Sequence, residues 1–417
     1  YVLAFLMYKS KHKLMRIVDY LLILLSIFTI GYWILNFEAI NYRTGAETPF
    51  DMAVAVVGVL IGIELARRVV GTVFVVLGTL LLLYGVYGDY VPDLFAHAGD
   101  TFPGLCTSIF YKSDGVFGIM ANVLATYVIL FVLFGAFLEK SGAQRFFIDF
   151  PLAAVGHRIG GPAKVSVIAS GLFGSISGSA IANTVSTGAF TIPMMKKAGF
   201  RPHIAGGIEP AASISGMFMP PIMGAGGFIM AELTGVPYSR IMLVAIFPAI
   251  MYVFSVFIMV HYEAKKYNIK GEKSEHSAME ILKTQWYYIM PLVMITILML
   301  YGFSPGYSAI LGIVTCLVIS WFKTDTRITP KRFIEASRAG TENSLKIGAT
   351  VGVIGIIIGV LTYRGLVLTF ADIVIELASG AVFFGIDFRL VATIFLTALA
   401  SLVLGMGVPV TAAYLVT

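Results

Sequence analysis

The sequence has few of the residues from which metal centres, disulfide frameworks and soluble surfaces are built. Its 417 residues include only two cysteines, Cys106 and Cys316, which offer neither a metal-ligand spacing nor a disulfide framework. Charged residues make up 12% of the chain, less than half of the ~25% found in an average soluble protein. No nucleotide-binding loop is visible, which argues against transport driven by ATP.

Apolar runs fill most of the remaining sequence. Hydrophobic residues account for 58% of the chain, and 43 glycines and 16 prolines interrupt the runs. The 29 Lys and Arg residues outnumber the 23 Asp and Glu residues and gather in short loops, as in the cytoplasmic loops of membrane proteins. This excess orients helices and does not indicate a nucleic-acid partner. We predict an all-α polytopic membrane protein whose outer surface contacts membrane lipid.

The stretch 160–232 organises the chain, and its apolar run is interrupted at Ser177-Gly178-Ser179. Only 31 residues separate Lys164 from Lys196, whereas a single crossing takes about 20 residues, so two full crossings do not fit. We therefore predict a re-entrant hairpin over 164–198 that enters and leaves on the cytoplasmic side. Non-helical backbone at membrane depth occurs where protein buries it or where it lines a cavity, so this tip is a candidate binding site.

A second break is predicted opposite this tip. A crossing helix begins near His203 and continues to Leu233, but Pro220 and Pro221 interrupt it. Consecutive prolines remove two backbone donors and do not fit inside a regular helix. We therefore predict a discontinuous helix over 203–233.

An internal repeat relates the two halves of the chain. Gly142 precedes an amphipathic segment and an apolar run that reaches Ser177, and Gly365 precedes the same order of segments up to Gly405. The basic loops give the helices before these glycines opposite orientations. Inverted repeats are typical of secondary transporters whose site lies between two broken elements.

These features divide the chain into four predicted parts. They are N-terminal helices over 1–100 without buried charge, a first transport repeat over 101–262, a cytoplasmic loop with connecting helices over 263–344, and a second inverted repeat over 345–417. Residues 100–114 are predicted to form a periplasmic connector. Because the chain opens without Met and ends inside an apolar pattern, we expect a fragment whose second hairpin is truncated.

Three segments, Phe173–Pro193, Pro220–Glu232 and Leu404–Ala413, resemble the membrane component of TRAP transporters, the tripartite ATP-independent periplasmic systems. The resemblance extends from Val116 onward and is greatest to TAXI-type permeases, in which the small and large membrane subunits are fused. The helices over 1–100 match such a fused small subunit in number and position. Where these permeases tend to have a Thr-Gly-Gly-Gln-like run, this chain has Ile-Ser-Gly-Met, so no role of that Gln carries over to Met217.

The resemblance implies an elevator-type symporter in the bacterial inner membrane, which takes a small organic acid from a periplasmic TAXI-type solute-binding receptor. It implies a sodium gradient as the driving force, with proton coupling left open, and no other cofactor. A receptor-independent sodium–dicarboxylate symporter, which shares re-entrant hairpins, is the alternative. An intramembrane enzyme is disfavoured, because the predicted crossings contain no paired carboxylates and no Ser-His set at one depth.

The breaks supply the chemistry that an anion and a cation need. Helix N-termini offer free N–H groups and partial positive charge to an anion, and the predicted substrate-binding residues are Ser179, Asn183, Thr184, Ser213, Ser215, Pro409 and Thr411. Broken helices offer carbonyl oxygens to sodium, and the predicted sodium-site residues are Ser177, Gly178, Ser179, Gly216, Gly405, Gly407 and Thr411. The competing interpretation of any single Ser or Gly is close helix packing.

Glu209 is the ionisable residue that stands out in these crossings. It lies about two turns into its predicted helix, at a depth where a carboxylate is costly and by default functional. We predict a proton carrier or an ion counter-charge at this position. A structural ion pair with His203 is the alternative.

Overall fold

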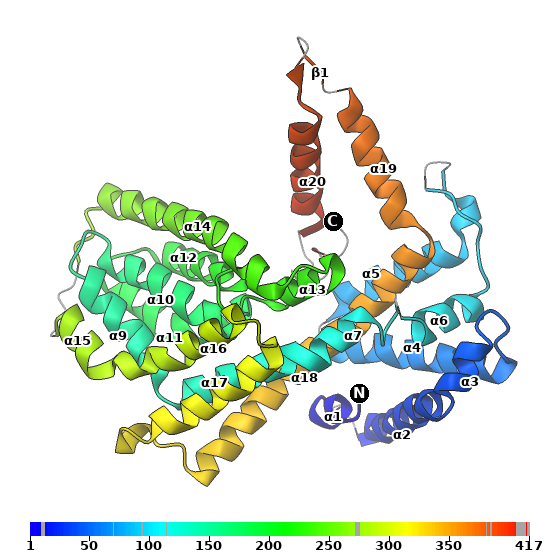
Figure 1. Cartoon of the computed structure of the whole chain (residues 1–417), viewed down its shortest axis with the longest axis horizontal. Coiled ribbons are helices and arrows are strands. Elements are labelled where there is room, and N and C mark those ends of the chain that lie inside the picture. The colour runs from blue at the N-terminus through cyan, green and yellow to red at the C-terminus, as the bar shows by residue number, and fades with distance from the viewer. Residues whose placement is uncertain are drawn as a thin grey trace. The chain divides into compact units, whose positions relative to one another are not determined.

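The structure is a computed structural model that describes residues 1–9, 13–69, 71–92, 95–113, 115–271, 276–380, 382–383, 386–405 and 414 (Figure 1). The first helices are α1 Val2–Met7, α2 Lys13–Leu35, α3 Phe37–Tyr42, α4 Pro49–Val69, α5 Thr72–Val86, α6 Phe102–Tyr111 and α7 Ile119–Val123. A π-helical turn, Leu124–Val128, leads into α8 Ile129–Lys140, α9 Ala143–Val155, α10 Gly161–Ser177, α11 Ala180–Lys197, α12 Pro202–Ile214 and α13 Ala225–Thr234. The last helices are α14 Tyr238–Lys266, α15 Ala278–Gln285, α16 Met290–Leu300, α17 Pro305–Ser320, α18 Pro330–Tyr363, α19 Leu366–Ser379 and α20 Arg389–Gly405.

Helices dominate the described residues, and six of them are long and apolar enough to cross a bilayer. These candidate spans are Arg16–Leu35, Pro49–Val69, Ile119–Lys140, Tyr238–Lys266, Ala278–Leu300 and Pro330–Tyr363. The strands found in the described part of the chain are β1 Val382–Phe383 and β2 Ile386–Asp387, an antiparallel pair of two residues each. The predicted class, a helical polytopic membrane protein, is confirmed.

Two compact units make up the chain. One contains residues 1–124 together with 345–417, and the other contains residues 125–344. The boundary between them falls at the π-helical turn and inside α18, so no loop separates the units. The four parts predicted from the sequence therefore do not coincide with these units, since residues 345–417 group with the N-terminal helices.

The N-terminal helices do contain buried charge, which corrects the prediction from the sequence. Asp51 in the first turn of α4 is fully buried and accepts hydrogen bonds from Arg43 Nε at 2.9 Å, Tyr32 Oη at 2.6 Å and Thr48 Oγ1 at 2.7 Å. At the other end of α4, Arg68 lies 2.5 Å from Asp19. The sequence missed these pairs because their members are up to 49 residues apart.

Residues 100–113, most of the predicted periplasmic connector, are largely helical. They contain α6, which Thr101 caps by accepting a hydrogen bond from Gly104 N at 3.2 Å. All residues from Leu105 to Tyr111 are buried. The Phe110 ring packs directly against Gly58 of α4, so that a Cβ added to Gly58 would lie only 2.2 Å from the nearest ring atom. This polar and aromatic segment thus forms a buried helix, because the missing side chain of Gly58 on α4 leaves room for the Phe110 ring.

The element order supports the internal repeat that the sequence predicts. Gly142 and Gly365 both adopt left-handed backbone conformations, with φ of +88° and +67°. Gly142 precedes α9 of 13 residues and then α10 of 17, and Gly365 precedes α19 of 14 residues and then α20 of 17. In Figure 1, α19 and α20 lie side by side as a hairpin with the strand pair at its tip. The inverted orientation of the two repeats remains a prediction.

The buried Asp51 yields a stability prediction. Replacing Arg43 with Met removes the cation from the buried carboxylate, and we expect a lower free energy of unfolding, because Asp51 keeps its charge but loses its charged partner. Thermal and denaturant unfolding of the purified protein would measure it. The matched control is Arg389→Met, which breaks an exposed pair with Asp387 at 3.8 Å and should change stability by at most about 0.5 kcal/mol. Equal losses for the two variants would contradict the role assigned to Asp51.

Candidate functional site

The chain breaks at the predicted tip, between α10 and α11. Helix α10 ends at Ser177, and Gly178 follows in the left-handed conformation with φ of +59°. Ser179 caps α11 by accepting a hydrogen bond from Ala182 N at 3.3 Å. A Cβ on Gly178 would lie 2.3 Å from Met223 O, so both the conformation and the close approach of a neighbouring segment favour glycine.

That neighbouring segment is the interruption between α12 and α13. Helix α12 ends at Ile214, a 3₁₀ turn covers Ser215–Met217, and α13 begins only at Ala225. Backbone hydrogen bonds hold the interruption together and fix it to the hairpin, since Gly224 N donates to Met217 O at 2.7 Å and Ile222 N donates to Ser175 O at 3.2 Å. The structure therefore brings the two breaks of this unit into direct contact.

Two glycines allow this contact. Gly174 on α10 and Gly216 in the 3₁₀ turn are both buried, and a Cβ on Gly216 would lie 2.3 Å from the Cα of Gly174. Real Cβ atoms do not approach backbone so closely, so each position excludes any larger residue. For Gly216, predicted as a sodium-site residue, the structure shows a role in helix packing.

The side chain of Asn183 is buried and hydrogen-bonds to the backbone of two neighbouring helices. Its side chain is 0% exposed, and Nδ2 donates to Ser170 O at 2.8 Å and to Ser213 O at 3.4 Å. The amide therefore ties α11 to α10 and α12. Because its donors are occupied by carbonyl oxygens, Asn183 does not face an open space in this structure.

The remaining predicted residues near the first tip fall into two groups. Ser177, Gly178 and Ser179 are half-buried at the tip itself. The hydroxyls of Thr184 and Ser215 donate to Ala180 O at 2.8 Å and Ala212 O at 2.6 Å within their own segments. In the second repeat, Gly405 is the last residue of α20, and the predicted positions 407, 409 and 411 (Gly, Pro and Thr) lie outside the described residues.

Glu209 lies inside a cage of five hydroxyl groups that three helices provide. It is 0% exposed. Its Oε1 accepts from Ser170 at 2.7 Å, from Ser213 at 3.3 Å and from Thr187. Its Oε2 accepts from Ser166 at 2.5 Å and from Thr191. We call these five residues and Glu209 the hydroxyl cage.

The hydroxyl cage was missed in the sequence, although its spacing is visible there. Each helix contributes two members four residues apart: 166 and 170 on α10, 187 and 191 on α11, and 209 and 213 on α12. Residues four apart lie on the same face of a helix, so each pair points to one side. His203, the predicted structural partner of Glu209, is exposed and is not part of the cage.

Close packing leaves little free volume around the carboxylate. A Cβ on Gly188 of α11 would lie 3.0 Å from Glu209 Cγ. The nearest basic residue on α10, Lys164, is directed elsewhere, with Nζ 3.0 Å from His261 Nδ1 of α14. No group of three or more His, Cys, Asp or Glu residues that could hold a metal ion occurs in the described part of the chain.

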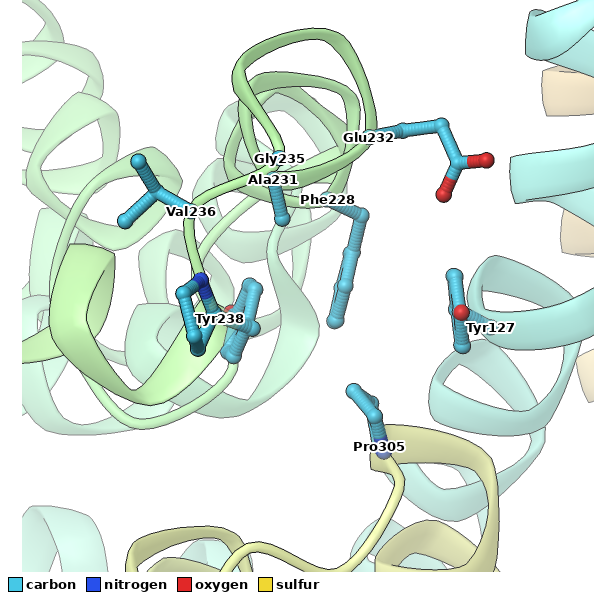
Figure 2. A pocket seen from close by; sticks show the side chains of 9 residues that line it. Tyr127, Phe228, Ala231, Glu232, Gly235, Val236, Tyr238 and Pro305 are labelled. Atoms are coloured by element: carbon cyan, nitrogen blue, oxygen red, sulfur yellow. The ribbon is translucent and has the colours of Figure 1, made fainter.

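A separate pocket of about 330 Å³ opens in the same unit. Figure 2 shows the ring of Phe228 between those of Tyr127 and Tyr238, with the side chain of Glu232 extending past them. The ring centroids of Phe228 and Tyr238 lie 4.3 Å apart, and the Tyr238 hydroxyl donates to Pro221 O at 3.2 Å, next to the break. Aromatic faces beside a carboxylate suit a cation or a flat apolar group, so this pocket does not suit an anion.

Comparisons with known proteins indicate what kind of molecule carries this site. Residues 57–417 match the family model described as "Tripartite ATP-independent periplasmic transporter, DctM component". The match begins inside the N-terminal helices, whose residues 1–100 are predicted to resemble a fused small subunit. Residues 57–100 of that region therefore belong to the part matched by the DctM component.

Several curated proteins are similar to parts of the chain. A putative TRAP transporter large permease protein of Haemophilus influenzae is 26% identical over 196 residues, 46% of this chain and 45% of that protein. A C4-dicarboxylate TRAP transporter large permease protein of Pseudomonas aeruginosa is 28% identical over 169 residues, 39% of each. A sialic acid TRAP transporter permease protein of Haemophilus influenzae is 26% identical over 195 residues, 46% of this chain and 31% of that protein. The chain thus spans less than half the length of these relatives.

The glycine contact between the two breaks gives a testable prediction. Gly216→Ala places a methyl group against the backbone of α10 and should lower the free energy of unfolding by about 1–3 kcal/mol, as overpacking does in other cores. The matched control is Gly207→Ala on the adjacent α12, where a Cβ would have no neighbour within 4 Å. That substitution should be neutral or stabilising by up to about 1 kcal/mol. Unfolding midpoints of the two variants would test the contact, and a stable Gly216→Ala protein would contradict it.

Proposed function

Because this chain belongs to the DctM component family of the tripartite ATP-independent periplasmic transporters, we propose that it is the permease of a secondary transporter that imports a small organic acid across the bacterial inner membrane. The family consists of transporter permeases and not of enzymes, as the sequence predicted. One observation supports the proposal most directly: the tip of the α10–α11 hairpin lies against the interruption between α12 and α13 in the same unit.

The tip offers an anion its recognition groups. Helix α11 begins at Ala180, so the free N–H groups of its first turn point toward the tip, where Ser177 and Ser179 are half-buried. Such N-termini bind carboxylates through N–H groups and the helix dipole. The similar permeases are named for C4-dicarboxylate and sialic acid, which are organic acids. We therefore assign substrate recognition to Ser177 and Ser179, with Asn183 positioning the hairpin.

A periplasmic solute-binding receptor delivers the substrate in this proposal, and an ion gradient drives its uptake by an elevator-type movement. The receptor is of the TAXI type, and the N-terminal helices include a fused small-subunit portion. The TAXI type is supported by the resemblance of the segments around the first tip. The fused portion is supported by the helices that precede residue 57, where the family match begins. Sodium at the exposed carbonyls of the tip and a proton at Glu209 are the two candidate coupling ions.

Uptake by the purified permease in liposomes tests the proposal. We expect accumulation of a labelled organic acid, from a panel that includes C4-dicarboxylates and sialic acid, only with the receptor and an ion gradient. Ser179→Leu should reduce uptake by about tenfold or more, because it removes a donor to a charged group. Ser255→Leu, an exposed position on α14, should leave uptake unchanged. Uptake without any receptor would support a receptor-independent symporter instead.

A further inference from the structure

The hydroxyl cage has a function that packing alone does not explain. From its geometry we infer that Glu209 binds and releases a proton during each transport cycle, and that the five surrounding hydroxyls form the proton-binding site. This inference rests on the proposed function and specifies which ion moves with the substrate. Four observations carry it: the burial of the carboxylate, the absence of a basic side chain beside it in the described part of the chain, the short oxygen–oxygen distances, and the connection to the hairpin tip.

No described basic group faces the carboxylate. The titratable groups on the three helices that provide the hydroxyls are Lys164 on α10, Lys196 and Lys197 on α11, and His203 on α12. Helix α14 adds Tyr252 and His261 along its length and further charged residues near its two ends, and α9, which packs against α10, adds the exposed Arg145 and the half-buried Asp149. Lys164 is paired with His261, and Tyr252 donates to Ala211 O at 2.8 Å. The two lysines of α11 and His203 are exposed at the helix ends. A buried carboxylate that lacks a cation is costly at membrane depth, and a bound proton removes that cost.

The oxygen–oxygen distances are those of direct hydrogen bonds, with no space for a metal ion between these groups as they stand. Ser166 and Ser170 lie 2.5 and 2.7 Å from the carboxylate oxygens, the range of hydrogen bonds to a charged oxygen. Sodium is close in size to calcium, whose oxygen ligands lie at about 2.3–2.6 Å, so oxygens that share such an ion sit about 3 Å or more apart. The hydroxyl cage is therefore too tight for sodium.

Both protonation states of Glu209 can be satisfied by the same side chains. Thr187 Oγ1 lies 2.8 Å from Asn183 O, and Thr191 Oγ1 lies 3.0 Å from Thr187 O. Each hydroxyl can therefore donate to the carboxylate, or donate to its backbone carbonyl and accept from a protonated carboxyl group. The exchange requires rotation of the hydrogen of whichever hydroxyl accepts from the carboxyl O–H, and no displacement of a helix.

The same network reaches the substrate tip. Ser170 and Ser213, whose hydroxyls contact Glu209, also provide the carbonyl oxygens that bind Asn183 Nδ2. Asn183 lies one helical turn after Ser179, and its N–H donates to Ser179 O at 2.9 Å. Because the carboxyl group is fully buried, it exchanges protons with water only when α11 or α12 moves away. Proton exchange is therefore tied to movement of the hairpin that carries the tip.

Infrared difference spectroscopy of the purified permease in lipid tests this site without any substrate. Between acidic and alkaline buffer, we expect a carbonyl band of a protonated carboxylic acid to disappear in the wild-type protein and to be missing from Glu209→Gln. Glu335→Gln, which changes an exposed carboxylate on α18, should retain the band. A wild-type spectrum without such a band, or a band that survives in Glu209→Gln, would overturn the inference.

A second variant keeps the test decisive if Glu209→Gln fails to fold. Thr191→Val retains the carboxyl group but removes one hydroxyl, and the frequency of the band should shift because a hydrogen bond to the group is lost. Thr341→Val is the matched control: like Thr191, Thr341 donates to the carbonyl oxygen four residues earlier, Ser337 O, but its hydroxyl is exposed. This substitution should not shift the band. An unshifted band in Thr191→Val would place the protonated group elsewhere and overturn the assignment.

Sodium and uptake measurements separate this inference from the proposed function. Replacing choline chloride with sodium chloride should leave the band unchanged, whereas its loss in the wild type would show that a cation occupies the site. In liposomes with the receptor, a proton gradient should drive uptake by the wild type. In Glu209→Gln, the uptake rate driven by the same proton gradient should be at least tenfold lower. Uptake driven by sodium and unaffected in Glu209→Gln would refute proton coupling while leaving the transporter function standing.

Discussion

The central constraint of unit 125–344 is the burial of one carboxylate among neutral hydroxyls. Glu209 receives hydrogen bonds from three helices and has no cation beside it among the described residues. Hydrogen bonds from these hydroxyls offset much of the hydration that the carboxylate loses on burial. They can do so only when α10, α11 and α12 are each rotated so that all five hydroxyl groups point toward Glu209. The hydrogen bonds to the carboxylate are therefore compatible with one rotation of each helix about its axis.

Close backbone packing then determines what the breaks can do. Gly174, Gly178 and Gly216 let the hairpin tip and the interruption of α12–α13 approach within van der Waals contact. Ser177 and Ser179 at the tip are half-buried, Ile181 in the first turn of α11 is exposed, and Asn183 is enclosed. The aromatic pocket at Phe228 and Tyr238 adjoins the same interruption, since the Tyr238 hydroxyl donates to Pro221 O, and its carboxylate makes it unsuitable for the proposed anion. The unit thus separates the tip, for which we propose anion recognition, from the buried Glu209. Asn183 contacts segments of both through its hydrogen bonds to Ser170, Ser213 and Ser179.

Charge is handled differently in the two units. In the N-terminal helices, Asp51 and Asp19 are buried with arginines as partners, an arrangement in which each carboxylate keeps its charge and loss of the arginine would leave that charge uncompensated. Glu209 has hydroxyls that can donate or accept, an arrangement that tolerates both a charged and a neutral carboxyl group. Side-chain chemistry therefore distinguishes a structural buried carboxylate from one suited to titrate.

The sequence by itself determined the helical membrane class, the breaks at Ser177–Ser179 and at Pro220-Pro221, and the repeated order of elements after Gly142 and Gly365. These features are local, since glycine, proline and apolar periodicity act within a few residues. Only the tertiary structure decided that Asn183 is enclosed, that Gly216 serves packing and that Glu209 has five hydroxyl partners. Residue spacing assigns a side chain to one face of its helix, but which faces meet depends on the rotation and packing of neighbouring helices, which no local pattern specifies.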